Sequence, residues 1–319
     1  MKAVYQIIIY RIKIASSMGN INVAVIGEKG YGRKIGKKGT QSDITFYNLK
    51  KGENTVTIIE PTGYPEKFSP LYYSLSISDI PIFVASSMDA YFGEALLAAW
   101  AMEKNNAIFI GEENILKEMI KEIDLKAMFF SDEIELREYL IREAERRKAR
   151  EKENGTVVID HFFNVRGVGT VILGTVVRGS VRKHDDLKLL PLNRDVHVRS
   201  IQKHDDDFGI ANEGDRVGIA LKGVDTGELK RGYVLTSEEL EMEKEIDLEI
   251  ERNKYWNGEI KEDAIFHIGF WMQFMPARYK NKFIFDKPIV FLNDSNFFIS
   301  HLDSKVPRVV GKGKIKQHL

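Results

Sequence analysis

Short apolar runs recur along the chain with two different spacings. In the first part, apolar runs at 21–26, 55–59 and 107–111 alternate with amphipathic segments such as 92–102. Such runs are typical of buried strands, and the amphipathic spacing is typical of a helix packed on a sheet. From residue 155 onward the helical spacing is absent, and runs of Val, Ile and Thr are closed by Gly, Asp, Asn or Pro. Evenly spaced short strands with such turns indicate small antiparallel barrels.

These patterns predict a multi-domain protein of the α/β plus β class. We expect an α/β domain over residues 1–150, a β-barrel over 151–237 and a second β-barrel over 238–319. The apolar stretch 1–14 is interrupted by polar residues, so we interpret it as an extra strand or an upstream extension rather than a signal peptide. Residues 133–150 predict a linker helix whose apolar first half docks on the α/β domain. Its charged second half is interpreted as solvated, with an RNA-binding face as the alternative.

Composition and charge narrow the classes of function. The chain has 47 basic and 47 acidic residues, so no excess of positive charge favours binding to nucleic acid in general, and we predict no DNA partner. The absence of cysteine excludes disulfides, thiol catalysis and thiolate metal sites. No apolar run approaches the length of a membrane span, so we predict no membrane partner and a cytoplasmic location.

Several ordered segments of the first barrel carry a family resemblance. Together they resemble the second domain of the elongation factor Tu-like translational GTPases, and in particular of the archaeal selenocysteine-specific elongation factors. The matching segments are 166–171, 189–191, 198–202, 214–225 and 231–235. The resemblance implies a P-loop GTPase-like α/β domain followed by two barrels, in which a GTP switch repositions the barrels.

The loop after the first strand has the glycine frame of a phosphate-binding loop. Gly27, Gly30 and Gly32 are spaced so that backbone N–H groups can face a phosphate. The family places Lys and then Ser or Thr after the last glycine, whereas this chain has Arg33 and Lys34. Lys34 lacks the hydroxyl that binds Mg²⁺, and a cation about 4 Å from another unit charge costs roughly 4 kcal/mol at an effective dielectric near 20. Both changes argue against a magnesium–nucleotide site.

The elements that sense the nucleotide in the family are also altered. Only residues 35–43 separate the loop from the next strand, which is too short for a helix and a switch loop; Thr40, Ser42 and Thr45 all remain candidates for the switch threonine. The family motif Asp-x-x-Gly-His is matched by Glu60, Gly63 and Tyr64. The ordinary pKa of tyrosine, about 10, makes Tyr64 unsuited to proton transfer near neutral pH.

The last family motif reads the guanine base, and here it ends in Asn114 in place of Asp. A carboxylate accepts from both guanine donors, whereas the asparagine amide offers one acceptor oxygen. We therefore predict a degenerate nucleotide-binding loop, no catalytic residues, no metal site and no cofactor, with GTP binding as the alternative. The residues of this loop are Gly27, Gly30, Gly32, Arg33, Lys34, Gly63 and Asn114.

Two basic clusters and one barrel pocket are further candidate sites. In the first barrel the resemblance implies a pocket for the aminoacyl end of tRNA formed by His161, Arg199 and Arg216, with Asp160 orienting His161; alternatively the arginines brace turns through Asp195 and Asp215. The remaining barrel histidines are interpreted as turn residues. The basic clusters either hold RNA phosphate or another anion, or are solvated. They comprise Lys29, Arg33, Lys34, Lys37 and Lys38 in the loop and Lys305, Arg308, Lys312, Lys314 and Lys316 in the tail.

Three functions are compatible with these features. The first is a non-catalytic protein resembling translation elongation factors that binds tRNA, the ribosome or a translation protein through its barrels. The second is an altered nucleotide hydrolase that uses the basic loop. The third is a regulator that competes for the partners of an elongation factor.

Overall fold

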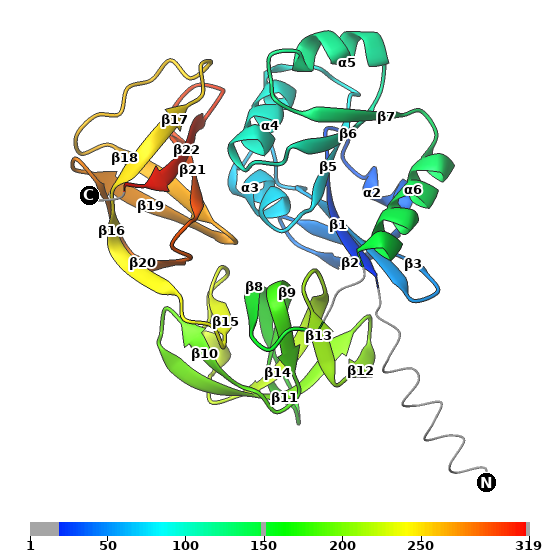
Figure 1. Cartoon of the computed structure of the whole chain (residues 1–319), viewed down its shortest axis with the longest axis vertical. Coiled ribbons are helices and arrows are strands. Elements are labelled where there is room, and N and C mark those ends of the chain that lie inside the picture. The colour runs from blue at the N-terminus through cyan, green and yellow to red at the C-terminus, as the bar shows by residue number, and fades with distance from the viewer. Residues whose placement is uncertain (1–18, 148–150, 317–319) are drawn as a thin grey trace.

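The computed structural model describes residues 19–147 and 151–316, which form three units built on separate sheets (Figure 1). The strand predicted within residues 1–14 and the last residues of the predicted linker helix lie outside these ranges. Among the helices of the described ranges, none is long and apolar enough to cross a bilayer.

The first unit is an α/β layer structure around a seven-stranded sheet in the order β2-β3-β4-β1-β5-β6-β7. The strands from β4 to β7 run parallel, and β2 and β3 form an antiparallel edge. The strand bounds are β1 Asn20–Ile26, β2 Lys37–Gln41, β3 Thr45–Lys51, β4 Asn54–Glu60, β5 Ile80–Val84, β6 Asn106–Ile110 and β7 Lys126–Phe130. The helices are α2 Gly32–Ile35, α3 Ser69–Ser76, α4 Ala90–Ala101, α5 Glu113–Ile120 and α6 Glu133–Arg146.

Helices cover both faces of this sheet, and alternate side chains of the buried strands pack against one face or the other. Ala24 and Ile26 of β1 pack with residues of α3, α4 and α5, whereas Val23 and Val25 pack with residues of α6. The predicted docking of the linker helix is correct for Leu136 and Leu140, which are buried. It is wrong for Ile134, whose side chain is 68% exposed because it lies on the outer face of the first turn of α6.

The short connection after the phosphate-binding loop contains a strand that the sequence pattern did not predict. One turn of helix, α2, leads into β2, which pairs with β3 at the edge of the sheet. The residues of β2 are almost all exposed and polar, so they lack the apolar alternation by which a half-buried strand is recognised. As predicted from its length, the connection holds no long helix.

The second unit is a closed barrel, as the sequence predicts. Six strands close in the order β10-β15-β8-β9-β14-β11, because β10 also pairs with β11, while β12 and β13 extend β11 and β9. The bounds are β8 Gly155–Val165, β9 Gly169–Arg182, β10 Asp186–Leu190, β11 Arg194–Lys203, β12 Asp206–Phe208, β13 Ile210–Asn212, β14 Arg216–Lys222 and β15 Val234–Thr236, with a 3₁₀ turn at Thr226–Glu228.

The third unit, predicted as a second barrel, is a half-barrel of seven antiparallel strands in the order β16-β20-β19-β18-β21-β22-β17. The strands β16 and β17 are consecutive in the chain but lie at the two opposite edges of the sheet. The bounds are β16 Glu241–Ile246, β17 Leu248–Arg252, β18 Ile265–Phe270, β19 Gln273–Tyr279, β20 Phe283–Phe291, β21 Asn296–Ser300 and β22 Val309–Ile315.

All three units contact one another. Tyr72 of α3 stacks on Phe274 of the half-barrel with ring centroids 4.6 Å apart, and its hydroxyl donates to the Trp271 carbonyl at 2.8 Å. Asn20 at the start of β1 donates to the Asp215 carboxylate of the barrel at 2.9 Å. These contacts hold the α/β unit against both β units at once.

Candidate functional site

The glycine-rich loop lies at the carboxyl end of β1, where its backbone is shaped to bind an anion. Gly27 and Gly30 have backbone φ angles of 114° and 86°, which residues other than glycine rarely adopt. A Cβ on Gly32 would lie 2.5 Å from the Tyr47 ring. The loop therefore needs these glycines, and the N–H groups of Gly30 and Gly32, here called the amide cradle, converge on one point.

The amide cradle is occupied by a side chain of the protein itself. Glu60, the last residue of β4, accepts from the Gly30 N–H at 2.5 Å and from the Gly32 N–H at 3.3 Å. Its side chain is buried, and the residue is 3% exposed. The carboxylate thus stands where the loop would offer its amides to a phosphate. Residue type alone identified Glu60 as a substitution but gave no sign of this contact.

The basic residues of the loop lie on the outside and are partly neutralised. Lys34 Nζ lies 3.3 Å from Glu28 and 3.7 Å from Glu133, and it sits over the Tyr31 ring at 4.5 Å. Burial, followed by the charge of Glu133, raises the pKa of the Tyr31 hydroxyl.

Other members of the predicted basic cluster are also engaged. Lys29 pairs with Glu66 at 3.1 Å, and Lys38 contacts Gln41, whereas Arg33 and Lys37 are exposed. The predicted cluster therefore does not present one uninterrupted positive surface.

Tyr64 stands at the position of the family's histidine and has a structural role in the α/β unit. Its hydroxyl lies 2.9 Å from the Glu94 carboxylate and 2.7 Å from the Tyr91 carbonyl. Burial and then the charge of Glu94 raise the pKa of Tyr64 far above its ordinary value. Glu94 in turn accepts from Arg308 of the half-barrel, from Nη2 at 2.6 Å and from Nε at 3.0 Å. The segment after β4 is thereby connected to the half-barrel.

The remaining predicted loop residues are spread along the same edge of the sheet. The N–H of Gly63 donates to the Asp43 carbonyl at 2.8 Å, and the Asp43 carboxylate accepts from both Nη atoms of Arg231 at 2.8 Å. Asn114 is exposed on the first turn of α5. Of the three candidate switch residues, Thr45 is buried and its hydroxyl lies 2.6 Å from that of Thr62.

Three of the four predicted pocket residues of the barrel come together, at its contact with the α/β unit. Asp160 accepts from Arg216 Nη2 at 3.0 Å and lies 2.5 Å from His161 Nδ1. Burial alone would raise the pKa of Asp160, but Arg216 and His161 outweigh it and hold the pKa below its usual value. The guanidinium of Arg216 covers the Phe46 ring of β3 at 3.5 Å.

The imidazole of His161 belongs to the same group, and one of its two ring nitrogens has no hydrogen-bond partner in the described part of the chain. Its Nε2 atom is buried and makes no hydrogen bond within the described ranges. Because Asp160 holds Nδ1, this second nitrogen is fixed in direction. Asp160, ionised beside a guanidinium, therefore holds Arg216 and His161 in fixed positions.

Arg199 does not join this group. It extends from β11 and donates to the Val168 carbonyl at 2.6 Å, so it braces the β8–β9 turn. The alternative in which Asp195 and Asp215 brace the arginines is also wrong in its partners: Asp195 pairs with Lys188 at 2.8 Å, and Asp215 pairs with buried Lys203 at 2.9 Å.

The sequence predicts that the remaining barrel histidines lie in turns, and this is correct for only two of the three. His184 and His204 have positive φ angles of 77° and 53° that place them in turns. His197 instead lies within β11, and its Nδ1 is 2.8 Å from Asp186 of the paired strand. Within residues 19–147 and 151–316, no group of three or more His, Asp or Glu side chains is placed to hold a metal ion.

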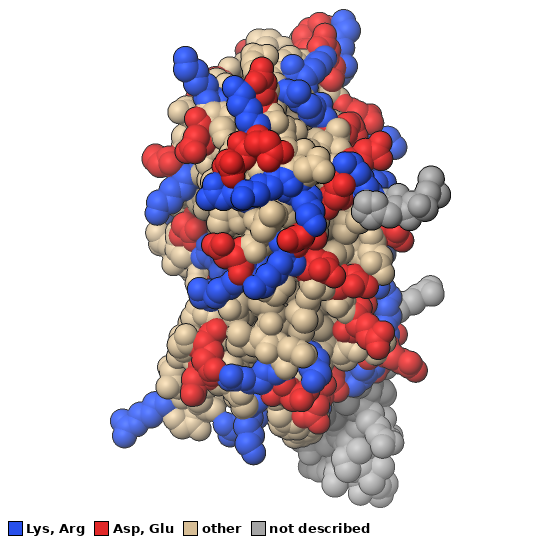
Figure 2. Space-filling view, turned by 90° about the vertical axis from the view of Figure 1, so that its left-hand side faces the viewer, with Lys and Arg blue, Asp and Glu red and all other residues tan. Residues whose placement is uncertain are grey.

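Three of the five basic residues predicted as a tail cluster take part in ion pairs. Arg308 binds Glu94, Lys312 lies 3.6 Å from Glu103 and 3.4 Å from Glu251, and Lys316 lies 2.7 Å from Asp247. On the face seen in Figure 2, basic and acidic side chains are interspersed. Lys305 and Lys314 are exposed. The tail therefore does not present one uninterrupted positive surface.

Comparisons with known proteins match this architecture. Residues 169–236 match the model of elongation factor Tu domain 2. The chain is 37% identical to uncharacterized protein MJ0325 of Methanocaldococcus jannaschii, over 93% of this chain and 100% of that protein. It is 50% identical to the selenocysteine-specific elongation factor of the same organism, over 26% of this chain and 18% of that protein. The chain thus spans about a fifth of the length of this second relative.

A solved structure extends the likeness of fold to the whole chain. The crystal structure of translation elongation factor SelB from Methanococcus maripaludis, in complex with the GTP analogue GppNHp, matches with a TM-score of 0.78 and 21% identity, over 94% of this chain and 80% of that chain. The α/β unit, closed barrel and half-barrel follow one another in the order of that factor. The chain belongs to the same family as protein MJ0325, and its residues 169–236 form a domain of the elongation factor Tu domain 2 family.

Proposed function

We propose that this chain is a translation factor without a nucleotide switch, which binds tRNA, the ribosome or a translation protein through its β units. The observation that supports this proposal most strongly is the carboxylate of Glu60 in the amide cradle. A phosphate would have to displace this buried group or lie beside it.

A phosphate that lay beside Glu60 would be repelled by its carboxylate. Two like unit charges about 4 Å apart repel by roughly 4 kcal/mol at an effective dielectric near 20. Mg²⁺ would not relieve this repulsion, because the residue at the position of its hydroxyl ligand is Lys34, held by Glu28 and Glu133. The loop therefore has a negative charge, Glu60, where a phosphate would bind and a positive charge, Lys34, where Mg²⁺ would bind.

The space beside the loop supports the same proposal. The pocket bounded by Lys29, Glu60, Tyr64 and Tyr91 has a volume of about 100 Å³. Sites for small molecules commonly have volumes of about 300–1,000 Å³. A nucleotide would require both Glu60 and the Tyr64 segment to move, and Tyr64 is tied to Glu94.

Binding through the barrel rests on the group formed by Asp160, His161 and Arg216. A guanidinium and an oriented imidazole suit a polar or anionic acyl group and the hydroxyls of a terminal ribose. The names of the relatives, which are elongation factors, favour a partner from translation.

Two assays test this function. In a deacylation assay, the wild-type protein is expected to slow hydrolysis of aminoacyl-tRNA, and Arg216→Ala is expected to lose this protection because Asp160 and His161 lose their orienting partner. Arg199→Ala, which changes an exposed arginine of the same barrel, is the matched control. Failure of the wild type to protect or retard any tRNA would remove the tRNA-carrier version and leave the ribosome or a protein as partner. Release of phosphate from GTP or ATP with ribosomes present would contradict the proposal as a whole.

A further inference from the structure

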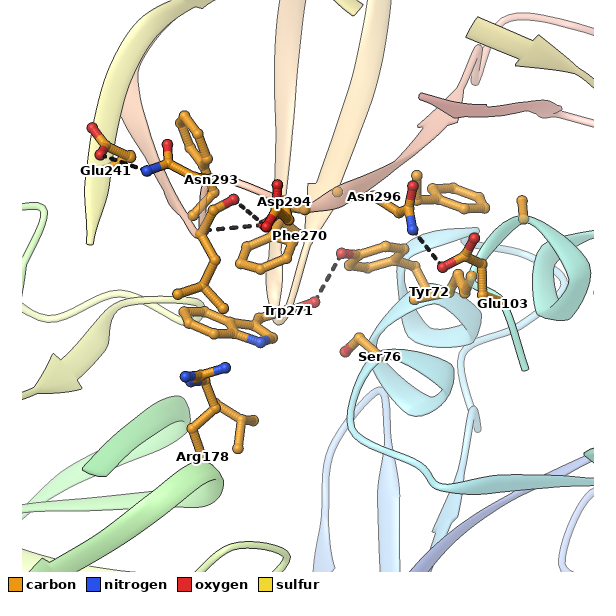
Figure 3. A pocket seen from close by; sticks show the side chains of 18 of the residues that line it. Tyr72, Ser76, Glu103, Arg178, Glu241, Phe270, Trp271, Asn293, Asp294 and Asn296 are labelled. Atoms are coloured by element: carbon orange, nitrogen blue, oxygen red, sulfur yellow. Dashed lines mark hydrogen bonds between the residues drawn. The ribbon is translucent and has the colours of Figure 1, made fainter. Parts of the chain in front are cut away.

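Two adjoining cavities lie where the three units meet, away from the amide cradle. The larger has a volume of about 770 Å³ and lies between α3, the end of α4, β9 and the turn from β20 to β21 (Figure 3). The second has a volume of about 510 Å³ and is bounded by β1, the segment after α3 and β9. Both are lined by Ser76, Val177, Glu213 and Trp271, so they form one path past the Trp271 side chain, here called the junction cavity. Its volumes and its place between domains are those of a small-molecule site.

The lining of the larger cavity carries an excess of negative charge. Its only basic side chains among the described residues are Lys104 and Arg178, and neither is free: Lys104 Nζ donates to the Ser78 carbonyl at 2.6 Å, and Arg178 Nε donates to Glu238 at 3.0 Å. The acidic lining residues are Glu103, Glu213, Glu239, Glu241 and Asp294. Glu103 lies 3.6 Å from Lys312 and Glu213 lies 2.9 Å from Lys152, so the excess negative charge comes from the other three.

Several of these acceptors lack a cationic partner. Glu239 and Asp294 make no ion pair within residues 19–147 and 151–316, and Glu241 accepts only from the neutral amide of Asn293 at 3.2 Å. In the lining of the second cavity, Asn22 is 4% exposed, and its Oδ1 atom has no donor in the described part of the chain. Buried acceptors are normally paired. The second cavity is also lined by Arg147 and Lys152, which pair with Asp79 at 2.8 Å and with Glu213 at 2.9 Å, so the unpaired carboxylates belong to the larger cavity.

Trp271 divides the path and is held rigidly. Its φ angle of 49° is unusual for a large side chain, and its carbonyl accepts from the Tyr72 hydroxyl at 2.8 Å. Figure 3 shows the indole between the half-barrel and Arg178 of β9. Bulky residues with positive φ persist where the surroundings fix them, often at ligand sites. The indole lines the cavity as a large apolar surface on which methylene groups can pack, and the Arg178 side chain lies beside it.

We propose that the junction cavity binds a linear polyamine. Its ammonium groups would contact the separated carboxylates, and its methylene segments would cross the Trp271 indole. Three carboxylates without a cationic partner, those of Glu239, Glu241 and Asp294, line the larger cavity, and in the described ranges no three such groups are placed to hold one metal ion. This suits several charges on one chain. This proposal does not rest on the state of the nucleotide loop or on a tRNA partner.

Calorimetric titration with spermine, at physiological ionic strength, tests the proposal. The wild type is expected to show one saturable site. Glu239→Gln combined with Asp294→Asn is expected to weaken binding about tenfold, because two exposed charge contacts are lost together. Both side chains are exposed, and the melting temperature without spermine verifies that the variant folds. Asp205→Asn combined with Asp206→Asn makes the same change of charge on the exposed β11–β12 turn and is expected to leave the affinity unchanged.

Two further arms make the result decisive. Trp271→Leu is expected to weaken spermine binding in a protein that keeps every carboxylate, which separates the aromatic contact from bulk charge. Equal affinity of the two double variants would overturn the proposal, because binding would then reflect overall charge. Binding of decalysine without binding of spermine would also overturn it, and would assign the cavity to a basic protein segment.

Discussion

At the scale of single residues, the carboxylate of Glu60 fills the amide cradle of the glycine-rich loop. The loop keeps the glycine conformations that aim two N–H groups at one point, and the chain supplies its own anion to meet them. A hydrogen bond to a charged group contributes about 1.5–3 kcal/mol, and leaving a buried donor unpaired costs about 1–3 kcal/mol. Glu60 therefore stabilises the loop in place of a ligand.

Glu60→Ala tests this role. We expect the free energy of unfolding to fall by about 2–4 kcal/mol, because two N–H groups lose their acceptor. The melting temperature of the variant, unlike that of the wild type, is expected to rise when inorganic phosphate is added, since phosphate then reaches the cradle. Glu66→Ala, which removes an exposed carboxylate paired with Lys29, is the control and should show neither effect. A phosphate response that is equal in all three proteins would show that Glu60 does not fill the cradle.

At the scale of elements, helix α4 links the segment after β4 to the half-barrel. Its Glu94 has a fully buried side chain that contacts Tyr64 on one side and Arg308 on the other. The N–H of Arg308 also donates to this carboxylate at 2.6 Å. The segment after β4 is thus connected through Glu94 to the residue that precedes β22.

Glu94→Gln should expose the strength of this link. Removal of one partner from a buried ion pair costs about 3–5 kcal/mol, because the Arg308 guanidinium stays buried without compensation. Urea unfolding, followed by circular dichroism, measures the loss. Glu113→Gln on α5 breaks an exposed pair with Lys117 and is expected to cost no more than about 0.5 kcal/mol. Similar losses in the two variants would mean that Glu94 is not a structural link.

Sequence patterns predicted elements well and contacts between units poorly. The strands of the barrel and the glycine frame follow from spacing and from backbone requirements that are local. The partners of Glu60, Glu94 and Arg308 are not local: Arg308 is separated from Glu94 by most of the chain, and in the sequence it appears as one of several tail cations. Strand β2 was missed because an exposed edge strand needs no apolar alternation.

At the scale of the whole molecule, ion pairs hold the three units in one arrangement. Asp43, beside the shortened switch connection, binds Arg231 of the barrel, just as Glu94 binds Arg308 of the half-barrel. Arg231 also lies over the Tyr73 ring at 4.8 Å. The connection between β2 and β3 and the segment after β4 are thus each bound to a different β unit.

The Asp43 contact gives the molecule a pH dependence of known sign. Burial would raise the pKa of Asp43, but the hydrogen bonds and charge of Arg231 outweigh burial and lower it. A lowered pKa in the folded state contributes stability above the unfolded value, about 3.9, and this contribution is lost as the pH falls through the folded value. The difference in unfolding free energy between the wild type and Asp43→Asn should be constant above about pH 5 and should shrink below about pH 4. A difference that grew on acidification would contradict this assignment.

We propose that side chains of the protein itself occupy the place of a nucleotide, and a calorimetric titration of GTP tests this proposal most directly. The wild-type protein is titrated with GTP, with and without Mg²⁺, under conditions in which a translational GTPase of the family serves as a positive control. We predict no saturable heat in either titration, because Glu60 fills the amide cradle and Lys34 stands at the position of the magnesium ligand. Micromolar binding of GTP that depends on Mg²⁺ would contradict the account.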